Sequence, residues 1–174
     1  MRPAASLRLG CLAMALGLAG LAQRGPARAA TPAGEWLPFQ GTWSASGERH
    51  SLPIEGGGTA AIIGISGAVV LSAGPGLSRG FTAEAIGFDD GLGASVGRSV
   101  WTDENGDRLF SSLKGEQVQT GRRVDGTITG GTGRYAGLEG DYTLTWQFVV
   151  PGEDGTIQGR TVTLTGRVRR AEAP

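Results

Sequence analysis

Eight segments of the chain have the composition and spacing of β-strands, and this repetition limits the fold more than any other feature. Each segment mixes apolar and polar residues in alternation and is bounded by Gly, Asp, Asn or Pro, as strands and their turns are. No segment shows a sustained helical period with capping residues, so no long helix is expected. The segments are Gly41–Leu52, Ala60–Ser72, Arg79–Phe88, Ala94–Glu104, Asp107–Lys114, Arg122–Gly130, Asp141–Val150 and Thr156–Arg169.

Consecutive strands with one apolar face have to hide that face from water. A sandwich covers it with a second sheet, whereas a barrel covers it by closing on itself. The 32 glycines are interleaved with Val, Ile, Leu, Thr and Trp rather than gathered into a linker, and glycines inside strands allow the sharp bends that closure needs. We therefore predict an all-β fold, a closed antiparallel barrel of about eight strands.

The first thirty residues have the features of a secretory signal peptide. Arg2 and Arg8 give a positive start, an apolar run follows from Leu9 to Ala22, and small residues end the segment at 27–30. This order of charge, apolar run and small-residue exit is typical of a cleaved export signal. We predict that residues 1–30 are removed, and that residues 31–174 form a single periplasmic or secreted domain. An uncleaved anchor and a lipid attached to Cys11 remain as alternatives.

Charge and cysteine content exclude several classes of partner and site. After removal of residues 1–30, twelve Lys and Arg would face sixteen Asp and Glu, a net charge of −4. Nucleic acids and anionic membranes both select a basic surface, so neither is an expected partner. The only cysteine, Cys11, leaves with the signal, so the mature chain has no disulfide and depends on its core.

The dipeptide Asn105-Gly106 is the strongest hairpin signal in the chain. As a two-residue type I′ turn, it pairs Trp101 with Phe110 and Val100 with Ser111. Trp101 and Phe110 then fall on the outer face, where they would cover the barrel or contact a second copy.

A five-residue loop at 89–93 gives the preceding hairpin, in which Glu84 lies directly opposite Arg98. The two registers agree on one shared face, and a slip of one residue would scramble it. The side chains expected inside the barrel on this basis are Ile86, Phe88, Val96, Val100, Leu109 and Leu113.

Glu84 and Arg98 are the first candidate functional pair, because a charge pair among apolar neighbours is costly unless it is well bonded. Such a pair would orient a polar group of a ligand, or exchange protons with it at a shifted pKa. The alternative is a structural ion pair that fixes the register or sits in water at the barrel mouth.

Residues 141–150 show the cleanest alternation in the chain. Tyr142, Leu144 and Trp146 share its apolar face, and the next strand is expected to place Leu164, Val162, Arg160 and Gln158 on the same side. Aromatic side chains there either line a pocket or belong to the core. We predict Glu84, Arg98 and Tyr142 as catalytic residues, and Trp146, Val100 and Leu113 as ligand-binding residues.

Metal and cofactor chemistry has little support in the sequence. Asp103, Asn105 and Asp107 have a spacing seen in calcium loops, but Arg108 stands where such a loop needs glycine and Lys114 where it needs an acid. His50 is the only histidine, too few for a zinc site. No metal and no cofactor are expected.

The segment Gly130-Gly131-Thr132-Gly133-Arg134-Tyr135-Ala136-Gly137-Leu138-Glu139-Gly140 resembles the allene oxide cyclase-like and dirigent-like barrels. Residues 127–145 carry most of this resemblance. It implies an eight-stranded barrel with an apolar pocket that steers the cyclisation or coupling of reactive small molecules, often as an oligomer. Dirigent-like members use acids and an arginine in the pocket, which Glu84 and Arg98 match in type only.

Two functional hypotheses follow. In the first, the exported barrel binds a small apolar molecule and steers its cyclisation or coupling without a cofactor, as a monomer or homo-oligomer. In the second, it is a non-catalytic structural or interaction barrel with a filled interior, since eight strands enclose either side chains or one small ligand. The pocket of the first hypothesis requires Ile86, Val100, Leu113 and Leu144 to share one interior.

Overall fold

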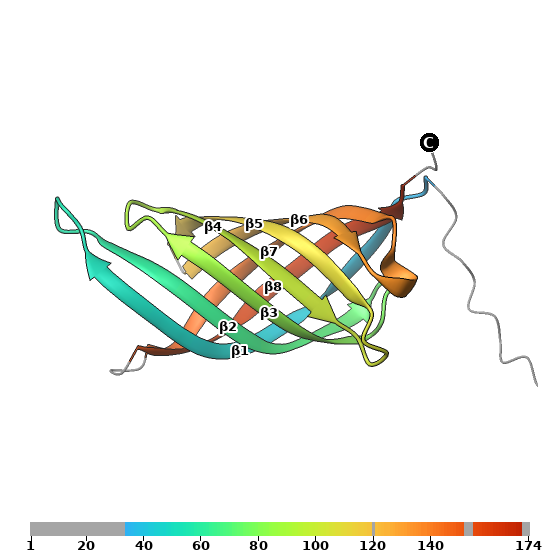
Figure 1. Cartoon of the computed structure of the whole chain (residues 1–174), viewed down its shortest axis with the longest axis horizontal. Helices are drawn as coiled ribbons and strands as arrows, with labels where there is room; N and C mark the ends of the chain where they lie inside the picture. Colours follow the sequence, from blue (N-terminus) through green and yellow to red (C-terminus); the bar gives the residue numbers. More distant parts are fainter. Residues whose placement is uncertain (1–33, 120, 152–154, 172–174) are drawn as a thin grey trace, which may run out of the picture.

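Eight antiparallel strands form a closed barrel, in which each strand pairs with its neighbours in the chain and β8 pairs with β1 (Figure 1). The computed structural model describes residues 34–119, 121–151 and 155–171. The predicted all-β closed barrel is confirmed, whereas the predicted signal peptide lies outside the described residues. The strands are β1 Leu37–Pro53, β2 Thr59–Ala73, β3 Gly80–Asp89, β4 Ala94–Thr102, β5 Arg108–Val118, β6 Gly121–Gly131, β7 Leu138–Pro151 and β8 Thr156–Arg170.

The two ends of the barrel differ. Because successive strands run in opposite directions, the β2–β3, β4–β5 and β6–β7 connections meet at one end, here called the η1 end after the short helix η1 (Gly133–Tyr135). The other four connections meet at the opposite end, here called the cavity end (Figure 1). In the part of the chain that the structure describes, no helix is long and apolar enough to span a membrane.

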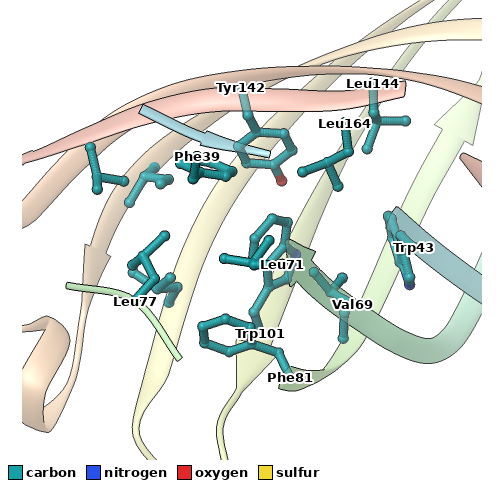
Figure 2. Close-up of a cluster of buried hydrophobic side chains, with 14 of the residues drawn as sticks. Phe39, Trp43, Val69, Leu71, Leu77, Phe81, Trp101, Tyr142, Leu144 and Leu164 are labelled. Atoms are coloured by element: carbon teal, nitrogen blue, oxygen red, sulfur yellow. The ribbon is translucent and has the colours of Figure 1, made fainter. Parts of the chain in front are cut away.

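Aromatic rings fill the half of the barrel nearest the η1 end (Figure 2). Trp101 is 1% exposed, and the centre of its ring lies 5.1 Å from that of Tyr142, 5.7 Å from Phe81 and 6.3 Å from Phe39. Tilted and edge-on contacts at these distances add to the stability that burial provides. This half of the interior is packed with side chains.

Interior glycines make room for these rings. A Cβ atom at Gly126 would collide with the ring of Tyr142, and one at Gly159 would lie 2.5 Å from the ring of Trp146. Each ring therefore lies flat against a neighbouring strand that has no side chain at that point. The glycines of β6 and β8 thus act through close packing as well as through bending.

The β4–β5 turn differs from the prediction by one residue. Trp101 pairs with Leu109, and Val100 with Phe110. The turn has three residues between Asp103 and Asp107, with Gly106 at φ +82°, as in a type I turn followed by a glycine bulge. A shift of one residue exchanges inner and outer faces, so the prediction of an outward Trp101 is wrong and that of an outward Phe110 is confirmed.

This shift also overturns the predicted interior face of β3 and β4. Ile86 is 68% exposed and Val96 58%, and Phe88 and Val100 share their outer face. Of the six residues predicted inside the barrel, only Leu109 and Leu113 point inward. Between the buried rings of Phe81 and Trp101 and the buried Asp89, the interior positions of β3 and β4 hold small residues: Ala83, Ala85, Gly87, Ser95, Gly97 and Ser99.

The predicted face of β7 is confirmed, since Tyr142, Leu144 and Trp146 are all buried. On β8, Leu164 points inward as expected, but the other three predicted partners do not. A bulge between Thr145 and Trp146 shifts the register, so that Trp146 faces Thr161. The outward residues are Gln158, Arg160 and Val162.

Candidate functional site

A cavity of about 100 Å³ occupies the interior near the cavity end. Its wall is almost wholly apolar and is built from seven strands, β1 to β7. Its large lining residues include Trp43, Ile63, Ile65, Leu113, Leu144 and Trp146. The indole rings of Trp43 and Trp146 pack edge-on at 5.3 Å and form one side of the wall.

The cavity exists because, at this level of the barrel, the inward-facing residues of β3 and β4 are all small. Ala85 and Gly87 on β3, Ser95 and Gly97 on β4, and Gly115 on β5 all line it. Opposite them, the rings of β1 and β7 do not reach across at this level. The interior is therefore filled at the η1 end and hollow at the cavity end.

An ion pair crosses the barrel at the edge of this cavity. Arg122 on β6 donates from Nη2 to Asp89 Oδ2 at 2.6 Å. The two strands are not neighbours, since β4 and β5 lie between them. The side chain of Arg122 passes the inner face of β5 at Gly115, where a Cβ atom would lie 3.4 Å from its Cδ.

Both partners of this ion pair are largely removed from water. The side chains of Arg122 and Asp89 are 16% and 7% exposed. Asp89 also accepts a hydrogen bond through Oδ1 from the backbone N–H of Gly91 at 3.1 Å. The carboxylate is thus held by the β3–β4 loop and in turn holds the guanidinium in place.

Two residues that line the cavity each have a buried side-chain nitrogen with no hydrogen-bond acceptor among the described residues. Four buried side-chain nitrogens are in this position: Trp43 Nε1, Arg49 Nε, Trp101 Nε1 and Arg122 Nη1. Trp43 and Arg122 both line the cavity. A buried donor left unpaired costs about 1–3 kcal/mol, so these two N–H groups are unsatisfied donors on residues of a largely apolar wall.

Comparison with family models, curated proteins and solved structures finds no match to this chain. What the site does therefore has to follow from its own geometry. The resemblance of residues 127–145 to the allene oxide cyclase-like barrels stays a prediction.

The structure separates the residues that the sequence grouped into one site. Trp146 and Leu113 line the cavity, and Tyr142 lies in the core beside it, where Ser99 Oγ is 3.2 Å from its hydroxyl. Burial raises the pKa of Tyr142, so its hydroxyl stays protonated. It is therefore a hydrogen-bonded core residue.

The other three predicted site residues lie on the outer face of the barrel. Glu84 pairs with Val100, and Arg98 pairs with Ile86, so the predicted Glu84–Arg98 register is wrong by two residues. Both charged side chains are exposed. The pair is therefore not inside the barrel, and the apolar cavity lies on the opposite face of the same strands.

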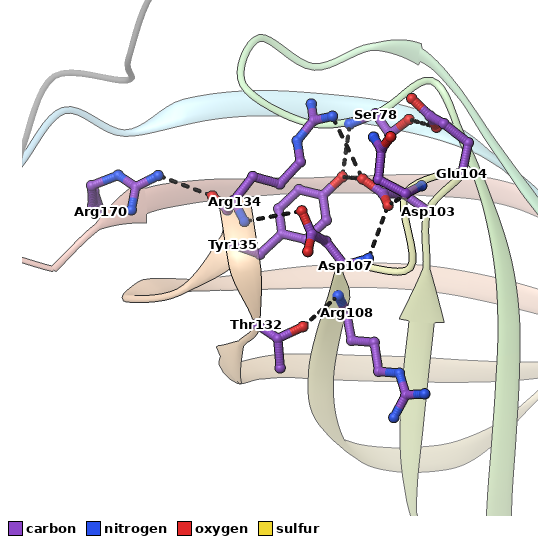
Figure 3. A network of polar contacts seen from close by, with 10 residues as sticks. Ser78, Asp103, Glu104, Asp107, Arg108, Thr132, Arg134, Tyr135 and Arg170 are labelled. Carbon is purple, nitrogen blue, oxygen red and sulfur yellow. Dashed lines mark hydrogen bonds and ion pairs between the residues drawn. The ribbon is translucent and has the colours of Figure 1, made fainter.

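A second polar network closes the η1 end and serves the fold (Figure 3). Asp103, whose side chain is fully buried, accepts a hydrogen bond from the Tyr135 hydroxyl at 2.8 Å and from the backbone N–H groups of Asn105 and Asp107. The guanidinium of Arg134 lies 3.5 Å away. These bonds join the β4–β5 turn to η1.

The carboxylates of residues 103–107 all accept hydrogen bonds from groups in or beside the β4–β5 turn. Asp107 accepts from the backbone N–H of Arg134, and Glu104 accepts from the Ser78 hydroxyl at 2.6 Å. Among the described residues, no group of three or more His, Cys, Asp or Glu is arranged to hold a metal ion. The spacing that suggested calcium is explained by these hydrogen bonds.

Proposed function

We propose that this barrel binds one small, largely apolar molecule in the cavity between β3, β5 and β7. The observation that supports the proposal is the apolar cavity itself, bounded by Trp43 and Trp146 on one side and by Ala and Gly positions on the other. Concave apolar sites with a few directed polar groups are the usual form of small-molecule sites. Eight-stranded barrels hold one such ligand when side chains do not fill them.

The proposed activity is binding rather than acid–base catalysis. Of the described residues that line the cavity, only Arg122 is charged, and Asp89 neutralises it. Neither is positioned to exchange a proton without leaving its partner unpaired in a buried place. Any steering of a cyclisation would therefore depend on the shape in which the cavity holds the molecule.

Filling the cavity is expected to abolish binding without unfolding the protein. Ala85 lines the cavity, so Ala85→Leu would place three further carbons in it. Benzene is a suitable probe, because closed apolar cavities of about 150 Å³ bind it and this cavity, although smaller, is partly open. We expect saturable binding to the wild type, near 1 mM, and at least tenfold weaker binding to Ala85→Leu, measured by NMR titration of the tryptophan indole signals.

The matched control is Ala68→Leu, which adds the same atoms on the outer face of β2. It should bind benzene as the wild type does. Glu84→Gln should also leave binding unchanged, because Glu84 is outside the barrel. Absence of benzene binding to the wild type, or equal binding to Ala85→Leu, would refute the proposed function.

We also propose that the domain works outside the cytoplasm, which rests on the sequence of residues 1–30. The full chain, expressed in a Gram-negative host, should yield periplasmic protein with the mass of residues 31–174. Leu16→Arg, which puts a charge into the apolar run, should leave the full-length chain inside the cell. Full-length protein in the periplasm or membrane fraction would contradict cleavage.

A further inference from the structure

The two unpaired N–H groups on residues that line the cavity indicate what kind of molecule it takes. A guanidinium has five N–H donors and no acceptor, and an indole nitrogen only donates. Asp89 uses Nη2 of Arg122, while Nη1 of Arg122 and Nε1 of Trp43 have no acceptor among the described residues. A ligand that satisfies either one must therefore present an acceptor, an oxygen or an unprotonated nitrogen.

Charge balance decides between a neutral and an anionic acceptor. Arg122 and Asp89 form a pair with no net charge, and Asp89 is buried. A carboxylate or phosphate bound beside this pair would leave a net negative charge within apolar walls, which is costly. A carbonyl, ester or ether oxygen accepts the same hydrogen bond and adds no charge.

The cavity also limits the size of the molecule. Its enclosed volume of about 100 Å³ is below the roughly 150 Å³ of a closed apolar cavity that binds benzene, but this cavity is partly open, so one ring can enter it without being fully enclosed. The ligand is thus of the size of one ring, with any longer part directed to the cavity end. A long-chain molecule would have most of its length outside.

We propose that the cavity selects a small neutral molecule of about one ring that carries a carbonyl or ether oxygen, and that Arg122 Nη1 donates to this oxygen. The proposal rests on the binding function proposed above and names the class of its ligand. Arg122 is then a binding residue, and Asp89 positions it.

The test compares three probes of similar shape: cyclohexanone, methylenecyclohexane, in which a CH₂ group replaces the oxygen, and cyclohexanecarboxylate. Each is titrated at pH 7 into the wild type and into the double variant Asp89→Asn/Arg122→Met, which removes both charges together. The measured quantity is the ratio of the affinity for cyclohexanone to the affinity for methylenecyclohexane. This ratio should be at least tenfold larger in the wild type than in the double variant, which corresponds to about 1.4 kcal/mol.

A second measurement needs no variant. With ¹⁵N-labelled arginine in the wild type, cyclohexanone should shift the side-chain signals of Arg122, and methylenecyclohexane should leave them in place. The proposed ligand class would be overturned if the ratio of ketone affinity to alkene affinity were the same in the double variant as in the wild type. It would also be overturned if cyclohexanone left the side-chain signals of Arg122 unshifted. Carboxylate binding tighter than ketone binding would overturn the charge argument.

Benzene separates failure of this inference from failure of the proposed function. If benzene binds the wild type but the ketone shows no dependence on Arg122, the cavity binds apolar molecules and the oxygen is not recognised. If neither benzene nor the three probes bind, both proposals fall.

Discussion

Replacing Trp101 by alanine is expected to lower the free energy of unfolding by about 3–5 kcal/mol, the usual loss for a buried aromatic residue. Trp101 is 1% exposed and contacts the rings of Phe39, Phe81 and Tyr142. These rings come from β1, β3 and β7, so the cavity left by the substitution would not be closed by the movement of one strand. Urea denaturation followed by far-ultraviolet circular dichroism measures the loss.

Phe110→Ala is the matched control, because Phe110 lies on the outer face of the adjacent strand. Its loss is expected to be below about 1 kcal/mol, as for most surface substitutions. The two variants together test the register of the β4–β5 hairpin. Equal, small losses would contradict the three-residue turn and would favour a two-residue Asn105-Gly106 turn, with both side chains outside.

The strands were predictable because their signals are local. Alternation and turn residues mark each segment, and all eight predicted segments correspond to strands. The largest difference at a strand start is in β1, which begins at Leu37 rather than Gly41. Leu37 pairs with Val168 of β8, at the seam that closes the barrel, and a partner more than a hundred residues away leaves little trace in local sequence.

The faces of β3 and β4 were not predictable from turn residues alone. Asn105-Gly106 satisfies both a two-residue type I′ turn and a three-residue turn with a glycine bulge. The hydrogen bonds that Asp103 accepts from the N–H groups of Asn105 and Asp107 favour the longer turn. One residue of difference then inverts every assignment along two strands.

The candidate site was missed for a different reason. Asp89 and Arg122 lie on β3 and β6, and only closure of the barrel brings them together. A signal was present in the sequence, since Arg122 alternates in phase with the apolar residues Val124 and Ile128. An arginine in phase with an interior face needs a buried acid, but the sequence does not say which strand supplies it.

Asp103→Ala is expected to lower the free energy of unfolding at pH 7 by about 3 kcal/mol, because it removes one partner from a buried charged network. The Tyr135 hydroxyl and the N–H groups of Asn105 and Asp107 would lose their acceptor. Asp125→Ala is the control: Asp125 is exposed and bonds to the exposed Arg123 and the half-buried Thr143, so its loss should stay near 0.5 kcal/mol.

Lowering the pH should narrow the difference in free energy of unfolding between wild type and Asp103→Ala. Burial alone raises the pKa of Asp103, but hydrogen bonds from Tyr135, Asn105 and Asp107, with the charge of Arg134, more than offset this and hold the pKa below its ordinary value of 3.8. A carboxyl whose pKa is lowered by folding stabilises the protein above its unfolded-state pKa, and that stabilisation is lost as pH falls through the folded-state value. Denaturation at a series of pH values from about 5 downward should therefore show the gap narrowing. If the difference in free energy of unfolding between wild type and Asp103→Ala stayed constant with pH, the packing of the Asp103 side chain and not its charge would account for its contribution, because only the charged carboxylate gains from these donors.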